Sequence, residues 1–147
     1  MPVEVRHLLR SPSLLICCDL QNGHCQPGER RFMVDFESTV SACGTLVKMW
    51  RGKGWPVAHL KRIFDSGWFP RSQPSLDWIR SVSPQPDELT FEHYLPSAYS
   101  SARYADYMRG MREMSCILAG FSLDETILST AIDGFHRGHR YYVACDA

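Results

Sequence analysis

The chain of 147 residues has no excess of either charge, because 16 Lys and Arg residues balance 16 Asp and Glu residues. Without a run of one sign, it lacks the basic footprint of proteins that bind nucleic acid or an anionic membrane. It also lacks an apolar run of the ~20 residues that cross a bilayer, and its first residues do not form a signal peptide. We therefore expect a cytoplasmic protein with a small-molecule substrate, with no nucleic-acid partner and no membrane partner.

Cys-x-x-Cys pairs are absent too, although the chain contains six cysteines. Cys17 and Cys18 are adjacent in an apolar run, so in a strand they would point to opposite faces of the sheet. The remaining cysteines are irregularly spaced. We expect reduced thiols rather than a disulfide framework, with Cys116 and Cys145 as buried packing residues.

Short apolar runs alternate with longer stretches of helical periodicity, which is the pattern of a parallel sheet flanked by helices. The pattern predicts strands at about 14–18, 56–60, 88–92, 115–121 and 140–145, and helices at about 36–54, 102–111 and 122–138. We expect a three-layer α/β/α fold, with a Rossmann-like parallel sheet of about five to six strands, in a single domain covering residues 1–147.

Two of the predicted helices have apolar side chains at helical spacing, which predicts that one face of each is buried. The first helix carries Phe36, Val40, Cys43, Val47 and Trp50, and the last carries Ile127, Ala131 and Phe135. Ser122 and Glu125 have the spacing of a capping box, which favours a helix start at Ser122.

Residues from about 63 to 86 interrupt this alternation, because four prolines there disfavour regular structure. The segment also contains aromatic side chains, namely Phe64, Trp68, Phe69 and Trp78. A long connection with its own aromatic residues is typical of a functional flap or a partner surface. The alternative is that these rings only pin the loop to the body of the domain.

Polar side chains follow several of the predicted strands. Asp19 follows the first strand, His93 the third, the segment Phe121–Thr126 the fourth and Asp146 the fifth. In an open α/β sheet, ligands bind at the carboxyl ends of the strands near the switch in strand order. These residues are therefore expected to converge although they lie far apart in the sequence.

Several segments together resemble the isochorismatase-like cysteine hydrolases, a family of α/β hydrolases that includes isochorismatases, nicotinamidases and N-carbamoyl amidohydrolases. The segments are Leu14–Asn22, Gly54–Val57, Ser97–Tyr99, Gly120–Thr130 and Gly138–Ala147. Two positions depart from the family pattern. Thr126 stands where the family has its nucleophilic cysteine, and His93 stands where it has its lysine.

The resemblance implies that Asp19 is the catalytic acid or base, with His93 and Thr126 in the other two catalytic positions. Glu92 is the alternative to His93 if the alignment is off by one residue, and no lysine follows Lys61. We expect substrate contacts from Gln21, Trp68, Phe69, Tyr99, Phe121 and Glu125. The Asp-x-His pair with which some amidases of the family hold a metal is missing after the second strand, so we expect no metal and no cofactor.

Three functions follow from these substitutions. In the first, the protein is a hydrolase without a cysteine nucleophile, in which Asp19 protonates a vinyl ether of an isochorismate-like substrate and water completes the cleavage. In the second, Thr126 is the nucleophile of an acyl hydrolase. In the third, the protein is catalytically inactive and binds a small molecule or a protein.

The resemblance also bears on the C-terminus, because the chain ends just after its last predicted strand. Family members usually have a further element there. We expect either that a tail follows in the natural protein or that a partner subunit covers the exposed part of the sheet, and we expect a homo-oligomer.

Overall fold

The computed structural model describes residues 10–64 and 74–147, and in these ranges five strands form one parallel sheet. The strands are β1 (Leu14–Cys18), β2 (Val57–Arg62), β3 (Leu89–His93), β4 (Ser115–Gly120) and β5 (Arg140–Val143). The helices are α2 (Phe36–Lys53), α3 (Ala102–Arg109) and α4 (Leu128–His136), and a π-helical turn, η5 (Leu123–Ile127), leads directly into α4. Short 3-10 turns occur at η1 (Asn22–His24), η2 (Pro74–Leu76), η3 (Arg80–Val82) and η4 (Ala98–Ser100).

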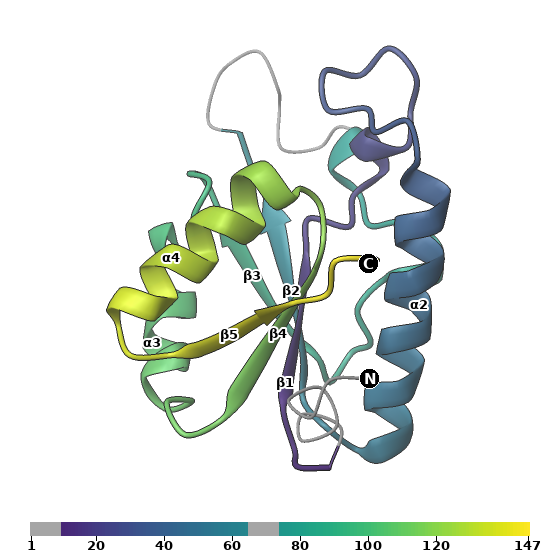
Figure 1. Cartoon of the computed structure of the whole chain (residues 1–147). Coiled ribbons are helices and arrows are strands. Elements are labelled where there is room, and N and C mark those ends of the chain that lie inside the picture. Colours follow the sequence, from purple (N-terminus) through teal and green to yellow (C-terminus); the bar gives the residue numbers. More distant parts are fainter. Residues whose placement is uncertain (1–9, 65–73) are drawn as a thin grey trace.

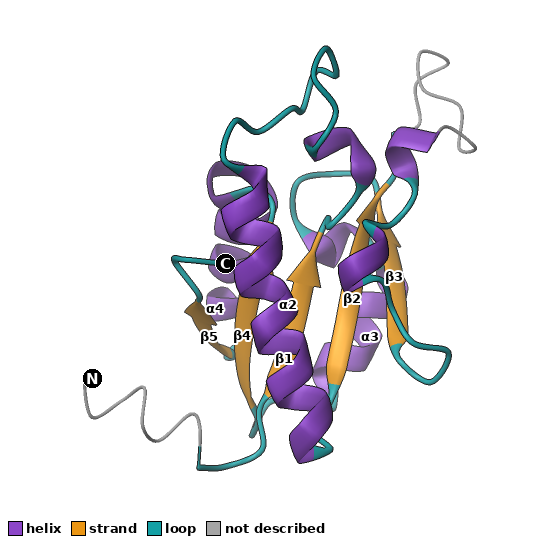
Figure 2. Ribbon diagram, turned by 90° about the vertical axis from the view of Figure 1, so that its right-hand side faces the viewer, coloured by secondary structure: helices purple, strands orange, loops and turns teal. Residues whose placement is uncertain are grey.

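The sheet is covered on both faces, which confirms the predicted three-layer α/β/α architecture. Helix α2 lies on one face, and α3 and α4 lie on the other (Figure 1). Figure 2 views the sheet from the side of α2. All five residues of β1 are buried, and they alternate between the two cores. Leu15 and Cys17 pack with residues of α2, whereas Leu14, Ile16 and Cys18 pack with residues of α3.

The predicted apolar faces of the helices agree with the structure in all but one residue. The face of α2 is confirmed, since Cys43, Val47 and Trp50 are buried and the side chains nearer its start are partly buried. The prediction for Phe135 was wrong, because this side chain is 76% exposed on the outer side of α4. The prediction that Cys145 is buried was also wrong, because β5 ends at Val143 and leaves Cys145 exposed beyond it.

The strand order is β3-β2-β1-β4-β5, so β1 is the central strand. The chain adds β2 and β3 on one side of β1 and then returns to add β4 and β5 on the other side. The order therefore switches between β1 and β4, where a crevice for a ligand is expected at the carboxyl ends of the strands. Asp19 follows β1 and Phe121 follows β4, and both are at this point.

Candidate functional site

The ends of β1 and β4 approach each other so closely that a side chain is excluded between them. Gly120 has a φ of +117°, and a Cβ atom on it would lie 2.3 Å from the carbonyl oxygen of Cys18. The amide of Phe121 donates to the same oxygen at 2.9 Å. Only glycine fits this conformation and this contact, and the result is that the start of η5 lies beside Asp19.

The chain turns sharply at both strand ends. Asp19 has a φ of +49°, in the left-handed region that aspartate tolerates better than most residues. The peptide bond between Phe121 and Ser122 is cis. Helix η5 begins after Ser122 as predicted, but the capping box was wrong, because the Ser122 side chain makes no capping hydrogen bond.

The three residues predicted as catalytic are brought together in one hydrogen-bonded group. His93 Nε2 lies 2.7 Å from Asp19 Oδ1, and the Thr126 hydroxyl donates to Asp19 Oδ2 at 2.5 Å. All three residues are 0% exposed. Each oxygen of the Asp19 carboxylate therefore has one hydrogen-bond partner, and the group is shielded from water. His93, and not Glu92, occupies the position beside Asp19.

One proton lies between Asp19 and His93, as the other bonds of the imidazole show. His93 Nδ1 is 2.8 Å from the carbonyl oxygen of Leu95. A carbonyl oxygen can only accept, so Nδ1 carries a hydrogen. The contact between Nε2 and Oδ1 then needs one further proton, because two lone pairs would repel each other at this distance. The pair holds this proton either on the imidazole or on the carboxyl group.

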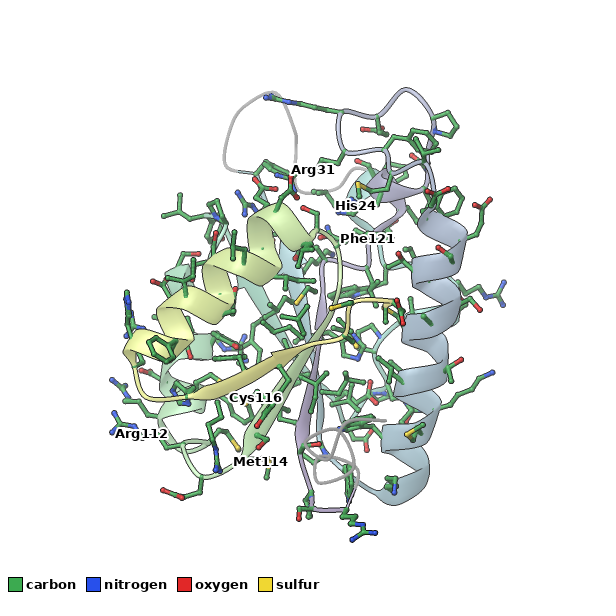
Figure 3. All side chains as sticks on the ribbon, in the orientation of Figure 1. His24, Arg31, Arg112, Met114, Cys116 and Phe121 are labelled. Carbon is green, nitrogen blue, oxygen red and sulfur yellow. The ribbon has the colours of Figure 1, made fainter. Side chains whose placement is uncertain are left out.

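A cavity of about 470 Å³ opens at the same end of the sheet. Its size falls within the range of small-molecule sites. The side chains and backbone that line it come from the loop after β1, the end of β2, η2 and η5: Gln21, Gly23, His24, Glu29, Arg30, Arg31, Arg62, Phe64, Ser75, Leu76 and Glu125. Figure 3 shows Arg31, His24 and Phe121 close together at this end, with Cys116 near the opposite end of β4.

Two of the predicted substrate-binding residues line the cavity, and both already have partners. The Gln21 amide donates to the carbonyl oxygens of Arg62 and Leu76 and accepts from the Arg62 amide. Glu125 forms an ion pair with Arg31 at 2.9 Å. Gln21 thus links the loop after β1 to β2 and η2, and Glu125 links η5 to the loop that contains Arg31.

The other predicted substrate-binding residues are placed differently. Phe121 is buried, and its ring stacks on His24 with 4.6 Å between the ring centroids. Tyr99 is buried in the core beside α3, with its hydroxyl bonded to that of Tyr141 at 2.8 Å. Tyr99 therefore does not line the cavity. Trp68 and Phe69 lie outside the described residues.

Only Gln21 and Glu125 of the cavity wall were among the predicted site residues, and the residues that were missed include His24, Arg31 and Arg62. Burial lowers the pKa of the His24 imidazole, although Asp19 acts in the opposite direction. His24 Nδ1 lies 3.1 Å from the Arg31 carbonyl oxygen, so Nδ1 carries the proton of the neutral ring. The sequence did offer one signal for Arg62, because this residue stands at the carboxyl end of β2, the strand next to the central strand β1.

The cavity and the Asp19 group are neighbours, but they are not continuous. None of Asp19, His93 and Thr126 lines the cavity. His24 and Arg62 do line it, and the charge of Asp19 acts on both of them. The wall between the cavity and Asp19 therefore includes the stacked rings of His24 and Phe121.

No cluster of three or more His, Cys, Asp or Glu side chains that could hold a metal ion is found within residues 10–64 and 74–147. Over the same ranges, no helix is both long and apolar enough to span a membrane.

The fold and the site together define a three-layer α/β protein of the kind that binds small molecules at the switch point of its sheet. The family model of the Isochorismatase domain matches residues 13–147. The chain therefore belongs to the isochorismatase family and has the fold of its hydrolases. No curated protein matches the chain.

Solved structures of the family share this fold at low sequence identity. A putative hydrolase of the isochorismatase family from Chromobacterium violaceum is 22% identical, with a TM-score of 0.80 over 92% of this chain and 70% of that one. An isochorismatase from Pseudomonas putida is 20% identical, with a TM-score of 0.81 over 95% and 71%. The N-carbamoylsarcosine amidase from Thermoplasma acidophilum is 20% identical, with a TM-score of 0.78 over 93% and 83%.

Proposed function

We propose that the protein is an isochorismatase-like hydrolase of a small molecule, in which Asp19 is the general acid and base and no cysteine is the nucleophile. The observation that carries the proposal is the contact of 2.7 Å between Asp19 Oδ1 and His93 Nε2, away from water, which requires a proton between the two groups. A carboxyl group supplied with a proton in a dry site suits acid catalysis. His93 takes over the electrostatic role of the family lysine, because its imidazole can hold the positive charge.

With a vinyl ether as substrate, Asp19 would deliver its proton to the terminal carbon of the double bond, and the π electrons would form the new C–H bond. Water would add to the resulting oxocarbenium carbon and return one proton to the Asp19 carboxylate. The hemiketal would then break into a ketone and an alcohol, which balances atoms and charge. Because Asp19 is wholly buried, turnover also requires a local opening of the wall beside His24.

The test is a panel of isochorismate, nicotinamide and N-carbamoyl substrates with the wild type, Asp19→Asn and Thr126→Ala. We expect turnover in the wild type and in Thr126→Ala, and a loss of at least 100-fold in Asp19→Asn, the scale of one general acid–base group. Cys25→Ala and Cys145→Ala serve as controls, because these are the two cysteines that are not buried. Loss of activity in either control would mean that a thiol is the nucleophile after all.

One observation favours the second candidate, an acyl hydrolase with Thr126 as nucleophile. The Thr126 hydroxyl donates to Asp19 Oδ2 at 2.5 Å, which is the arrangement of a hydroxyl and its general base. This candidate predicts that Thr126→Ala is as inactive as Asp19→Asn, and that an acylating probe labels Thr126 in the wild type. Mass spectrometry of the labelled protein distinguishes it from acid catalysis.

The third candidate, an inactive binding module, is favoured by the complete burial of the Asp19 group. It predicts no turnover on the panel, together with a ligand that raises the melting temperature of the wild type and of Asp19→Asn equally.

We also propose that the chain forms a homo-oligomer through the outer side of α4. Leu128, Ile132 and Phe135 are spaced by four and three residues and are 50%, 49% and 76% exposed. An apolar stripe of this kind is typical of a contact surface. Ile132→Glu is expected to reduce the mass measured by light scattering, whereas Thr45→Glu, at an exposed position of α2 on the other face of the sheet, leaves it unchanged. A wild-type mass equal to one chain would contradict the proposal.

We further propose a cytoplasmic location, because all six cysteines are free, which suits a reducing compartment. Cell fractionation would test it, and recovery from the culture medium or periplasm would contradict it.

A further inference from the structure

The guanidinium of Arg62 is buried, and its hydrogen-bond donors lack acceptors among the described residues. Its side chain is only 7% exposed, and its guanidinium makes no hydrogen bond with any part of the chain that the structure describes. The Nε and Nη1 atoms are shut off from solvent without a partner. Buried polar groups are nearly always hydrogen-bonded, and a buried charge without a partner is costly. The guanidinium nevertheless lines the cavity.

Within residues 10–64 and 74–147, Glu125 is the carboxylate that forms an ion pair with Arg62, but the contact is long. Its Oε1 atom is 3.9 Å from Arg62 Nη2, beyond hydrogen-bond distance, whereas its Oε2 atom is 2.9 Å from Arg31 Nη1. Glu125 is thus paired with Arg31. Burial lowers the pKa of the Arg62 guanidinium, and Glu125 opposes this only in part.

The charged side chains on the cavity wall have a net charge of one positive unit. Arg30, Arg31 and Arg62 contribute three positive charges, and Glu29 and Glu125 contribute two negative ones. A single negative charge on a ligand would balance the wall. Nη2 is the one nitrogen of the Arg62 guanidinium that is not shut off from solvent. It forms one edge of the group with Nη1 and another with Nε, so a carboxylate that reaches Nη2 from the cavity would pair with a whole edge after a small turn of the Arg62 side chain.

We infer that Arg62 anchors the carboxylate of a small organic monoanion in this cavity. That this molecule is a substrate rests on the proposed function. The two coplanar oxygens of a carboxylate match an edge of the guanidinium, and its one charge matches the surplus. Leu76 and Phe64 also line the cavity, and the Phe64 ring lies 4.3 Å from Arg31 Cζ and 5.4 Å from Arg62 Cζ, measured to its centroid. The cavity of about 470 Å³ limits the molecule to modest size.

The test measures binding rather than turnover, by calorimetry with acetate, benzoate, the neutral isostere benzamide and inorganic phosphate. We expect at least one carboxylate to bind saturably, with benzamide weaker than benzoate by about 10- to 100-fold, the scale of one charge-assisted hydrogen-bonded contact. Arg62→Met should lower carboxylate affinity by the same factor. Arg112→Gln is the control, because it removes an exposed positive charge that lies away from the cavity (Figure 3), and it should change affinity less than threefold.

A second readout separates a ligand anchor from a structural arginine. Arg62 would lose only a long ion pair with Glu125 at 3.9 Å and a contact with the Phe64 ring at 5.4 Å from the centroid. Arg62→Met without ligand should therefore melt no lower than the wild type, whereas a structural role would lower its melting temperature. The inference is overturned if no carboxylate binds, if benzamide equals benzoate, if Arg112→Gln loses as much affinity as Arg62→Met, or if phosphate binds more tightly than the carboxylates. Arg62-dependent binding of a carboxylate, together with no turnover on the substrate panel of the proposed function, would leave the anchor intact and count against the hydrolase.

Discussion

Replacement of His93 by leucine should lower the free energy of unfolding, because it leaves the buried Asp19 carboxylate without its main partner. Asp19 and His93 are both fully buried and 2.7 Å apart. After His93→Leu, the carboxylate retains only the bond from the Thr126 hydroxyl. Removing one partner of a buried ion pair costs about 3–5 kcal/mol. For a chain of this length, that corresponds to a fall in melting temperature of roughly 6–20 °C.

The assay is urea unfolding at pH 7 followed by circular dichroism, with a double-mutant cycle. In the double variant Asp19→Asn/His93→Leu, the uncompensated charge is gone and an amide can still accept from Thr126. We expect the double variant to be more stable than His93→Leu alone, with a coupling energy of about 1–3 kcal/mol between the two sites. Two results would refute the reasoning: a cost below about 1 kcal/mol for His93→Leu, or strictly additive effects in the cycle.

Three further predictions concern stability. Burial raises the pKa of Glu88, but hydrogen bonds, foremost from Arg51, lower it to about 2. The Glu88 carboxylate therefore stabilises the folded state above its unfolded pKa, and this stabilisation is lost as pH falls toward 2. In urea titrations, Glu88→Gln should lower the free energy of unfolding by up to roughly 3 kcal/mol at pH 7 and by almost nothing near pH 2. Gly134→Ala should lower stability by about 1–3 kcal/mol, because its Cβ would lie 1.9 Å from the Tyr141 ring. Gly52→Ala places a Cβ with no atom within 4 Å, so it should instead raise the free energy of unfolding by about 0.5–1 kcal/mol, and the melting temperature with it.

Much of the fold could be predicted from the sequence, because its elements have clear periodicity. The run from Leu14 to Cys18 is apolar on both faces, as a central parallel strand requires, and the stripe on α2 is regular. Phe135 was misplaced because helical spacing alone does not distinguish the last turn of a buried face from an apolar outer face. Cys145 was misplaced because β5 ends two residues earlier than the apolar run suggested.

The candidate site could be predicted only in part. Asp19, His93 and Thr126 were identified because they stand at the catalytic positions of the family that the sequence resembles, and their places at or after strand ends predicted that they converge. The signal for the cavity wall is weaker, because among its missed residues Arg62 stands at a strand end and the others lie in loops or turns. The burial of Arg62 depends on how the loop after β1 folds over the end of β2, and the His24 stack depends on where Phe121 lies. Such contacts between distant segments leave no periodic trace in the sequence.

The three hydrogen bonds of Gln21 determine which side of the cavity can move. They fasten the loop after β1 to the backbone of Arg62 and Leu76, so these segments should shift as one rigid block, and the amide of Arg62 should exchange its hydrogen slowly with solvent. The opposite side of the cavity includes Glu125 of η5, which is joined to the loop after β1 by the ion pair with Arg31 at 2.9 Å. The two side chains of this pair are 25% and 36% exposed, and salt screens such a pair. We therefore expect η5 to move away from the loop after β1 more readily as the salt concentration rises, with faster amide exchange in η5 than at Arg62.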